Sequence, residues 1–223
     1  MNVKLISYSK PLEKMEGVFD AKDLIAYCAR VSNPSNQTNK KTSEKLLRYL
    51  IKNKHWSPFE MVSACLEIET TRDIARQILR HRSFSFQEFS QRYADPTDDL
   101  SFITRECRLQ DENNRQNSIE IENDPSIQED TIKQDLITEW QRRQTGIINQ
   151  CKEAYKWAVE HGIAKEQARV VLPEGLTKSR LYMNGTLRSW IHFIELRSDN
   201  GTQKEHRLIA LECAKVISEI FEL

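Results

Sequence analysis

The stretch Met61–Tyr93, which reads MVSACLEIETTRDIARQILRHRSFSFQEFSQRY, decides the fold because its hydrophobic period changes within it. Apolar and polar side chains alternate over Met61–Glu69, the pattern of a half-buried, antiparallel strand. One of the two threonines that follow caps a helix predicted over Arg72–Arg80. Over His81–Tyr93 we expect a polar turn studded with aromatic residues. The stretch therefore predicts a strand followed directly by a helix.

The rest of the chain reads mostly as helix. Hydrophobic periodicity and capping residues predict helices over Asp20–Ser32, Thr42–Asn53, 126–160, Ala164–Val171, Leu187–Arg197 and Gln203–Phe221. Strands are predicted over Asn2–Tyr8 and Leu181–Met183, the second leading into an Asn184-Gly185 turn, and Thr186 caps the helix after it. A few strands among segregated helices predict an α+β fold with an antiparallel or mixed sheet and one long helix at about 126–160.

The length and the polar stretches bear on domain organisation. The 223 residues fit one domain, 1–223, because no internal repeat and no clean linker interrupts them. Eight acidic and two basic residues lie between Gln110 and Asp135. We expect a solvated acidic insertion at about 110–130 and assign it no chemistry.

Charge and glycine content exclude several classes of function. Lys and Arg total 33, as do Asp and Glu, so the net charge is zero and a bulk basic footprint for nucleic acid is absent. The six glycines are too widely spaced to form a G-x-G-x-x-G turn or a Walker loop. Any phosphate must therefore be bound by arginines or by ordinary helix N-termini.

Cysteine usage and hydropathy bear on the compartment. The five cysteines are odd in number and contain no C-x-x-C pair, so we expect free thiols in a reducing compartment and no metal site. The N-terminus lacks a basic segment followed by an apolar one, and no apolar run approaches ~18 residues. We expect a soluble, cytoplasmic protein with no membrane partner.

Arginines gather in the second half of the opening stretch. Helical spacing places Gln77 and Arg80 on one face, and Arg82 and Arg92 follow in or near the turn. The planar guanidinium suits bidentate contacts to phosphate, so this is where we expect an anion site. The same arginines also fit a solvated helix face, and the local composition by itself favours that interpretation.

The order of these residues resembles a known pattern. Arg80-His81-Arg82, then seven residues, then Ser90 is similar to the R-H-R-x7-S signature of the flavin-dependent thymidylate synthases. Three further blocks resemble segments of that family in the same order: His55–Glu60 (HWSPFE), Ala168–Pro173 (ARVVLP) and Leu187–Arg197 (LRSWIHFIELR). Together the four blocks cover about residues 50 to 205.

The resemblance implies one reaction. FAD is reduced by NADPH, a one-carbon unit passes from 5,10-methylenetetrahydrofolate to C5 of dUMP, and the products are dTMP and tetrahydrofolate. The hydride passes through the flavin, and no cysteine acts as nucleophile. The resemblance also implies a homotetramer whose sites combine side chains from several subunits, with no nucleic acid as partner.

Residue roles follow from the matched motifs. The resemblance assigns dUMP binding to Gln77, Arg80, Glu88, Ser90, Gln91, Arg92, Arg169 and Arg197. It assigns FAD binding to His55, Ser57, Arg80, His81, Arg82, Glu88, Thr186, Arg188 and His192. Arg197 is the catalytic candidate, because a fixed cation at the uracil ring stabilises negative charge that develops there. Ser90 is expected to bind phosphate, since no base is spaced to activate it as a nucleophile.

Each role has a simpler alternative. Arg197 near the end of a helix also complements the helix dipole, His55 can cap helix carbonyls, and Arg169 alone reads as a surface residue. Four positions depart from the commonest family pattern: Met61, Thr186, His192 and Gly201. The departures weaken the late FAD contacts most.

Two rival functions remain open at this point. One is a nucleic-acid-binding module in which arginines alternate with stacking rings, namely Arg80, Arg82 and Arg92 with Phe84, Phe86 and Phe89. The neutral total charge and the acidic stretch argue against it. The other is a flavin-binding relative that has lost methylation.

Overall fold

The computed structural model describes residues 2–124 and 127–221. Its strands are β1 (Asn2–Tyr8), β2 (Ser63–Thr71), β3 (Ser85–Glu88), β4 (Arg108–Gln110), β5 (Ser118–Glu120) and β6 (Lys178–Thr186). Its α-helices are α1 (Ala21–Ala29), α2 (Ser43–Lys52), α3 (Arg72–Ile78), α4 (Pro96–Asp99), α5 (Asp130–Glu160), α6 (Lys165–Ala168), α7 (Leu187–Arg197) and α8 (Lys204–Ile220). Short 3-10 turns are η1 (Pro34–Asn36), η2 (Lys40–Thr42), η3 (Ser57–Met61), η4 (Ile121–Asn123) and η5 (Arg169–Val171).

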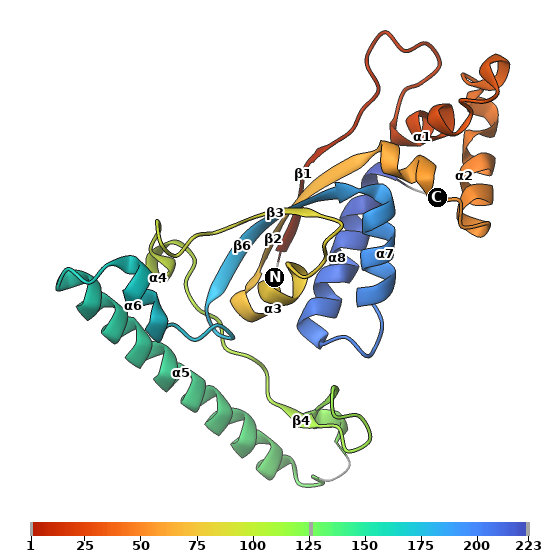
Figure 1. The fold of residues 1–223 in the computed structure, drawn as a ribbon. Helices are drawn as coiled ribbons and strands as arrows, with labels where there is room; N and C mark the ends of the chain where they lie inside the picture. The colour runs from red at the N-terminus through yellow and green to blue at the C-terminus, as the bar shows by residue number, and fades with distance from the viewer. Residues whose placement is uncertain (1, 125–126, 222–223) are drawn as a thin grey trace.

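The main sheet has the strand order β1-β2-β6-β3, and each neighbouring pair is antiparallel. Helices α7 and α8 lie beside this sheet, α1 and α2 lie at one end, and α5 runs diagonally away from it (Figure 1). The predicted α+β class, the antiparallel sheet and the long helix are confirmed. Because α3 follows β2 without a loop, the sheet directly positions the arginine-rich segment.

The strand predicted over Met61–Glu69 runs over Ser63–Thr71, and Met61 is an exposed residue at the end of η3. The alternation from Val62 onward places the apolar side chains in the core. Val62, Ala64, Leu66 and Ile68 are each at most 2% exposed, and they pack with the aromatic side chains of α7 and the apolar face of α8. Trp190 of α7 donates from its indole nitrogen to the carbonyl of Ala64 at 3.0 Å. The sheet and the two C-terminal helices therefore form one core.

Two local predictions are wrong for the same reason. The segment predicted as a turn over His81–Tyr93 contains β3, and the strand predicted over Leu181–Met183 extends over Lys178–Thr186. Asn184 and Gly185 lie inside β6 because the strand pairs with β2 on one side and β3 on the other. Pairing between distant segments extends both strands beyond what their local pattern predicts.

Gly185 allows a close approach within the sheet. A Cβ atom built at Gly185 would lie 2.4 Å from the Phe84 ring. Phe84 packs edge-on against Trp190, with ring centroids 4.8 Å apart. The glycine therefore gives the ring of Phe84 its place against α7.

Of the predicted helix caps, one is confirmed and one is not. Thr71 is the N-cap residue of α3, but its side chain makes no capping hydrogen bond and donates to Asp73 Oδ1 instead. The Thr186 side chain accepts from the backbone N–H of Ser189 at 3.3 Å, which confirms Thr186 as the cap of α7. The long helix begins at Asp130 rather than at 126, and residues 125–126 lie outside the described residues. The helix predicted over Ala164–Val171 divides into α6 and the 3-10 turn η5.

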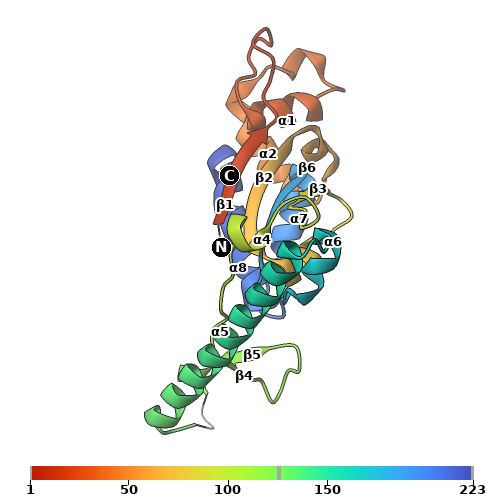
Figure 2. The ribbon, with the colours of Figure 1, turned by 90° about the vertical axis from the view of Figure 1, so that its left-hand side faces the viewer.

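The N-terminal half of α5 projects from the body of the molecule, and the β4–β5 hairpin stands beside it (Figures 1 and 2). The acidic stretch at about 110–130 holds part of this hairpin and the 3-10 turn η4, whose Ile121 is buried. Ile132, Leu136 and Trp140 of α5 are between 40% and 46% exposed. In the part of the chain that the structure describes, no helix has the length and apolar character needed to cross a membrane.

Candidate functional site

The structure distributes most of the predicted site residues among three groups. The central cluster, at the end of α3 and on α7, comprises Gln77, Arg80, His81 and Arg197. The α6 cluster, beside α6 and η5, comprises Glu88, Ser90, Gln91, Arg92 and Arg169. The η3 cluster comprises His55, Ser57, Arg188 and His192. Arg82 is an exposed residue in the loop from α3 to β3, and the hydroxyl of Thr186 caps α7.

In the central cluster, Arg197 fixes the protonation of His81. Arg197 Nε donates to His81 Nε2 at 2.9 Å. Because a guanidinium can only donate, Nε2 must carry a lone pair, and the proton of the neutral ring sits on Nδ1. Burial and the charges of Arg197 and Arg80 lower the pKa of His81 to about 4. At neutral pH the imidazole is therefore uncharged, with Nδ1 as its hydrogen-bond donor.

Positive charge in the central cluster lacks an acidic counterpart. Among the described residues, Arg80, Arg82 and Arg197 form no ion pair. Burial, and then the charge of Arg80, lower the pKa of Arg197. Neighbouring guanidiniums that no acidic side chain among the described residues neutralises favour binding of an anionic ligand.

Gln77 turns toward the interior rather than to solvent. Its Nε2 donates to Gln203 Oε1 at 2.8 Å, and its Oε1 lies 3.3 Å from His206 Nδ1. Sequence reasoning missed both partners. The available signal was that His206 interrupts the apolar stripe of Ile209, Ala210 and Cys213 at helical spacing, where a polar residue needs a hydrogen-bond partner.

The α6 cluster is built around acidic residues that orient arginines. Arg92 Nε lies 3.8 Å from Glu166 Oε2, and Arg169 Nε donates to the Glu166 carbonyl at 3.3 Å. Glu88 accepts from Ser179 Oγ at 2.8 Å and pairs with Arg76 at 3.3 Å. Glu88 therefore belongs to a set of ion pairs with α3, whereas Arg92 and Arg169 share Glu166.

This cluster borders a surface pocket of ≈ 400 Å³. Its lining comprises Arg72, Arg76, Gln91, Glu166, Gln167, Arg169, Val170, Leu172 and Glu174. Gln91 is 4% exposed and its Nε2 has no hydrogen-bond partner in the described part of the chain. An unpaired buried donor beside three arginines suits an anionic oxygen acceptor. Arg72 and Arg76 of α3 also line this pocket.

The η3 cluster connects η3 with α7. Arg188 Nη1 donates to Glu60 Oε1 at 2.6 Å, and the His192 ring packs edge-on against Trp56 at 4.9 Å. His55 and Ser57 are both exposed. The cluster presents polar groups to solvent beside a partly buried indole ring.

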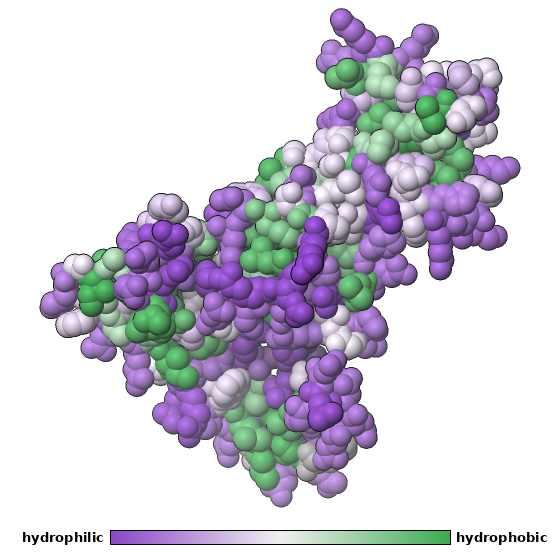
Figure 3. Space-filling model, in the orientation of Figure 1, coloured by the Kyte–Doolittle hydropathy of each residue, from purple (hydrophilic) through white to green (hydrophobic). Residues whose placement is uncertain are grey.

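The central and α6 clusters are separate within one chain. Helices α6 and α7 lie on opposite sides of the sheet in Figure 1, with a belt of strongly hydrophilic side chains between them at the level of α3 (Figure 3). Within the described ranges, no hydrogen bond or ion pair joins Arg169 or Arg92 to Arg197. One chain therefore brings the predicted residues together in parts, not in a single site.

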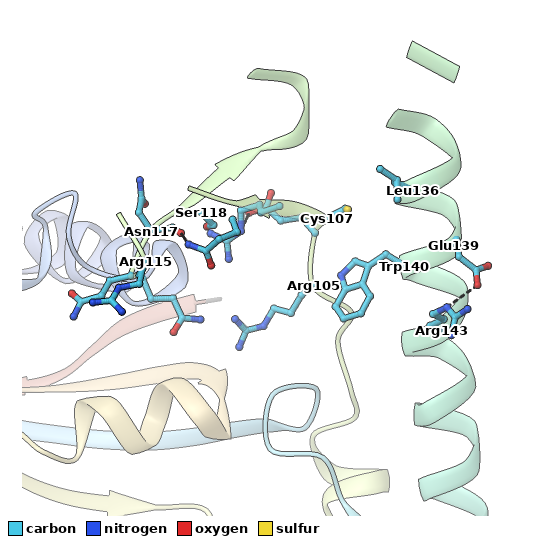
Figure 4. Close-up of a pocket in the computed structure, with 14 residues that line it drawn as sticks. Arg105, Cys107, Arg115, Asn117, Ser118, Leu136, Glu139, Trp140 and Arg143 are labelled. Atoms are coloured by element: carbon cyan, nitrogen blue, oxygen red, sulfur yellow. Dashed lines mark hydrogen bonds and ion pairs between the residues drawn. The ribbon is translucent and has the colours of Figure 1, made fainter. Parts of the chain in front are cut away.

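A further pocket, of ≈ 670 Å³, lies between α5 and the β4–β5 hairpin. Trp140 and Leu136 point from α5 toward the segment that carries Arg105 and Cys107, whereas Arg143 pairs with Glu139 (Figure 4). Gln203 also lines this pocket. None of the predicted site residues lines it.

The side chains constrain two other kinds of chemistry. Burial raises the pKa of each of the five cysteine thiols, so none is poised as a thiolate. In the described residues, no group of three or more His, Cys, Asp or Glu side chains could hold a metal ion. Phe84 is 9% exposed and packs in the core, so the proposed row of three stacking phenylalanines does not form.

Comparisons with a family profile and with known proteins point to the same family. A family profile described as "Thymidylate synthase complementing protein" matches residues 14–222. The chain is 49% identical over 221 residues to a probable flavin-dependent thymidylate synthase of Paramecium bursaria Chlorella virus 1, covering 99% of this chain and 95% of that protein. It is 46% identical over 223 residues to the flavin-dependent thymidylate synthase of a Synechocystis strain, covering 99% and 96% respectively.

The fold also has solved counterparts. The UMP/dUMP methylase PolB of Streptomyces cacaoi, bound with 5-Br dUMP, aligns with a TM-score of 0.74 at 24% identity, covering 98% of this chain and 90% of that one. The same enzyme bound with 5-Br UMP aligns with a TM-score of 0.76. At this identity, the likeness establishes a shared fold.

Proposed function

The chain belongs to the flavin-dependent thymidylate synthase family, and from that premise we propose that it converts dUMP to dTMP with FAD as cofactor. The observation that carries the proposal is the pair Arg80 and Arg197, whose charges no acidic side chain among the described residues neutralises. Two anionic nucleotides need such cations, and the chain has no glycine loops to bind their phosphates.

The residues of the central and η3 clusters, together with Arg82 and Glu88, fit FAD. The free guanidiniums of Arg80 and Arg82 suit its pyrophosphate, and His81 offers a neutral Nδ1–H donor beside them. His55, Ser57, Glu88, Arg188 and His192 supply further polar contacts, whereas the Thr186 hydroxyl already caps α7. When bound, the flavin supplies the hydride chemistry that completes the methyl group.

The α6 cluster fits the phosphate of dUMP. Arg92 and Arg169 carry the charge, the free Nε2 of Gln91 offers a donor, and Ser90 adds a hydroxyl. Gln77 and Arg80 lie toward the uracil ring. Arg197 then faces the ring, where its fixed charge stabilises negative charge that develops as C5 becomes nucleophilic. The protein's own contribution is thus to orient and polarise.

We further propose that no cysteine attacks the substrate, because burial raises the pKa of all five thiols. The co-substrates are 5,10-methylenetetrahydrofolate, which gives the one-carbon unit, and NADPH, which reduces the flavin. A cytoplasmic location fits both of these and the free thiols.

The separation of the central cluster from the α6 cluster has a consequence for how subunits associate. Within the described residues, no hydrogen bond or ion pair joins Arg92 or Arg169 to Arg197. We propose a homotetramer in which the α6 cluster of one subunit completes the central cluster of another. Each active site would then contain arginines from at least two copies.

Two measurements test the function. The purified protein should show a flavin absorbance band near ~450 nm. It should release tritium from [5-³H]dUMP only when methylenetetrahydrofolate and NADPH are both present, with UMP as the comparison substrate. A protein without flavin that releases no tritium contradicts the proposal. Bound flavin without tritium release supports the rival interpretation of a flavin-binding relative that has lost methylation.

A further inference from the structure

The Gln77 amide lies in a chain of hydrogen bonds that ends on His206, a residue without an assigned role. Gln203 Nε2 donates to Glu205 Oε2 at 3.0 Å, and Gln77 Nε2 donates to Gln203 Oε1 at 2.8 Å. Gln77 Oε1 then lies 3.3 Å from His206 Nδ1. The His206 side chain is fully buried, so its polar atoms depend on such partners.

Glu205 determines which group donates and which accepts in each of these hydrogen bonds. Burial alone would raise the pKa of Glu205, but a hydrogen bond from Arg108 and the charges of Arg105 and Arg108 outweigh it, and the net pKa is lowered. The carboxylate is therefore ionised and can only accept. Gln203 must turn its NH₂ group toward Glu205, which leaves its carbonyl oxygen facing Gln77.

The orientation of Gln203 fixes that of Gln77, which in turn fixes the tautomer of His206. Gln77 gives its NH₂ group to Gln203 and turns its carbonyl oxygen toward His206. His206 must then carry its proton on Nδ1 in order to donate. Its Nε2 lacks a hydrogen-bond partner among the described residues, as expected of a ring that keeps a lone pair there. The neutral ring is stable because burial, Arg197 and His81 lower its pKa to about 3.

We propose that His206 is a positioning residue for Gln77. By donating to Oε1, it holds the Gln77 amide in one of its two flipped orientations, so that dUMP meets a fixed pattern of donor and acceptor. This inference rests on the proposed function, which places Gln77 beside dUMP. The location supports it, since the His206 and His81 ring centroids are 6.2 Å apart and His81 binds Arg197.

A purely structural role makes a different prediction. His206 also packs against Phe193, with ring centroids 5.8 Å apart, and lies on the apolar face of α8. If packing were its only task, leucine would replace it better than asparagine would. If the Nδ1–H donor matters, asparagine replaces it better, because the asparagine NH₂ group can occupy a similar place.

The test compares His206→Asn with His206→Leu in the FAD-loaded protein. Equilibrium dialysis with radiolabelled dUMP should show affinity about five- to tenfold weaker in His206→Leu, the loss of one hydrogen bond, and within about twofold of wild type in His206→Asn. Thermal unfolding should give the reverse order, with His206→Leu the more stable variant. The control His161→Leu, at an exposed position where the ring bonds the Trp157 carbonyl at the end of α5, should leave the dUMP affinity unchanged. Equal dUMP affinities in the two His206 variants overturn the inference.

A second measurement needs no substrate. Urea unfolding of His206→Leu, Gln77→Leu and the double variant forms a mutant cycle, and the hydrogen bond predicts at least threefold coupling between the unfolding constants. Additive effects overturn the inference even where dUMP binds. If the wild-type protein binds no dUMP, the proposed function fails, and this cycle alone decides whether His206 holds Gln77.

Discussion

The Nε atom of Arg197 lies 2.9 Å from Nε2 of His81, across the space between α7 and the end of α3. This contact joins the catalytic candidate to the centre of the R-H-R motif, and it determines which ring nitrogen of His81 carries the proton. Neither Arg197 nor its neighbour Arg80 forms an ion pair with an acidic side chain in the part of the chain that the structure describes. The electrostatics of the site follow from this arrangement.

Replacing Arg197 should separate catalysis from cofactor binding. Arg197→Ala is expected to lower kcat by about 10²- to 10³-fold, because it removes the charge that stabilises the developing anion on the uracil ring. FAD content should stay within about twofold, since Arg80 and Arg82 remain. The 5-³H release assay and the flavin absorbance check the two values. Equal loss of both would contradict the catalytic role.

Ser90 should prove dispensable for chemistry. Its Oγ accepts from the Arg92 backbone N–H at 3.4 Å, and no base activates it. Ser90→Ala is expected to weaken dUMP binding by about two- to tenfold while substantial turnover remains at saturating dUMP. Steady-state kinetics separate the two effects. Abolished turnover with unchanged dUMP affinity would show that the hydroxyl is a nucleophile.

Gly185→Ala should destabilise the sheet where Phe84 packs. The added Cβ lies 2.4 Å from the Phe84 ring, so the ring must move against Trp190, at a cost of about 1–3 kcal/mol. The matched control is Gly146→Ala in the middle of α5, where nothing lies within 4 Å of the new Cβ. There the higher helix propensity of alanine should raise the free energy of unfolding by about 0.5–1 kcal/mol. Urea unfolding at fixed protein concentration compares the pair, and similar effects at both glycines would argue against the close approach.

Stability should fall on mild acidification because of the buried His206. The folded-state pKa of His206, about 3, lies below its ordinary value of 6.5. Between these values the unfolded chain binds more protons than the folded one, so stability is complete above about pH 6.5 and is lost as the pH falls. Such a histidine contributes a slope of about 1.4 kcal/mol per pH unit.

The variant His206→Asn isolates the contribution of His206 to this pH dependence. Between pH 6.5 and pH 5, the free energy of unfolding should fall by about 1–2 kcal/mol less in His206→Asn than in wild type. Urea unfolding at each pH measures both proteins. Parallel losses in the two proteins would mean that His206 does not titrate as its burial requires.

The parts of the fold that sequence predicted are those that local patterns determine. The alternation over Met61–Glu69 and the cap at Thr186 act within a few residues, and the structure confirms both. The edge strand β3 was missed because only its pairing with β6, about 95 residues later, makes its four residues a strand.

The arrangement of the site depends even more on contacts between segments that are distant in the sequence. The matched motifs predicted Arg80, His81 and Arg197 as site residues. Their arrangement in space, however, depends on how α3 and α7 lie relative to one another. The partnership of Gln77 with His206 spans 129 residues and has no local sign. Likewise, no pattern along the chain reveals that Arg169 shares a pocket with Arg72 and Arg76 of α3.

The central claim is that arginines from different copies of the chain complete each active site, and mixing two inactive variants tests it most directly. Arg169→Ala and Arg197→Ala should each be nearly inactive alone. Co-expressed and assembled together, they should recover about a quarter of wild-type tritium release, because random assembly unites both intact arginines in about one site of four. Mixed assemblies as inactive as their components would contradict shared sites.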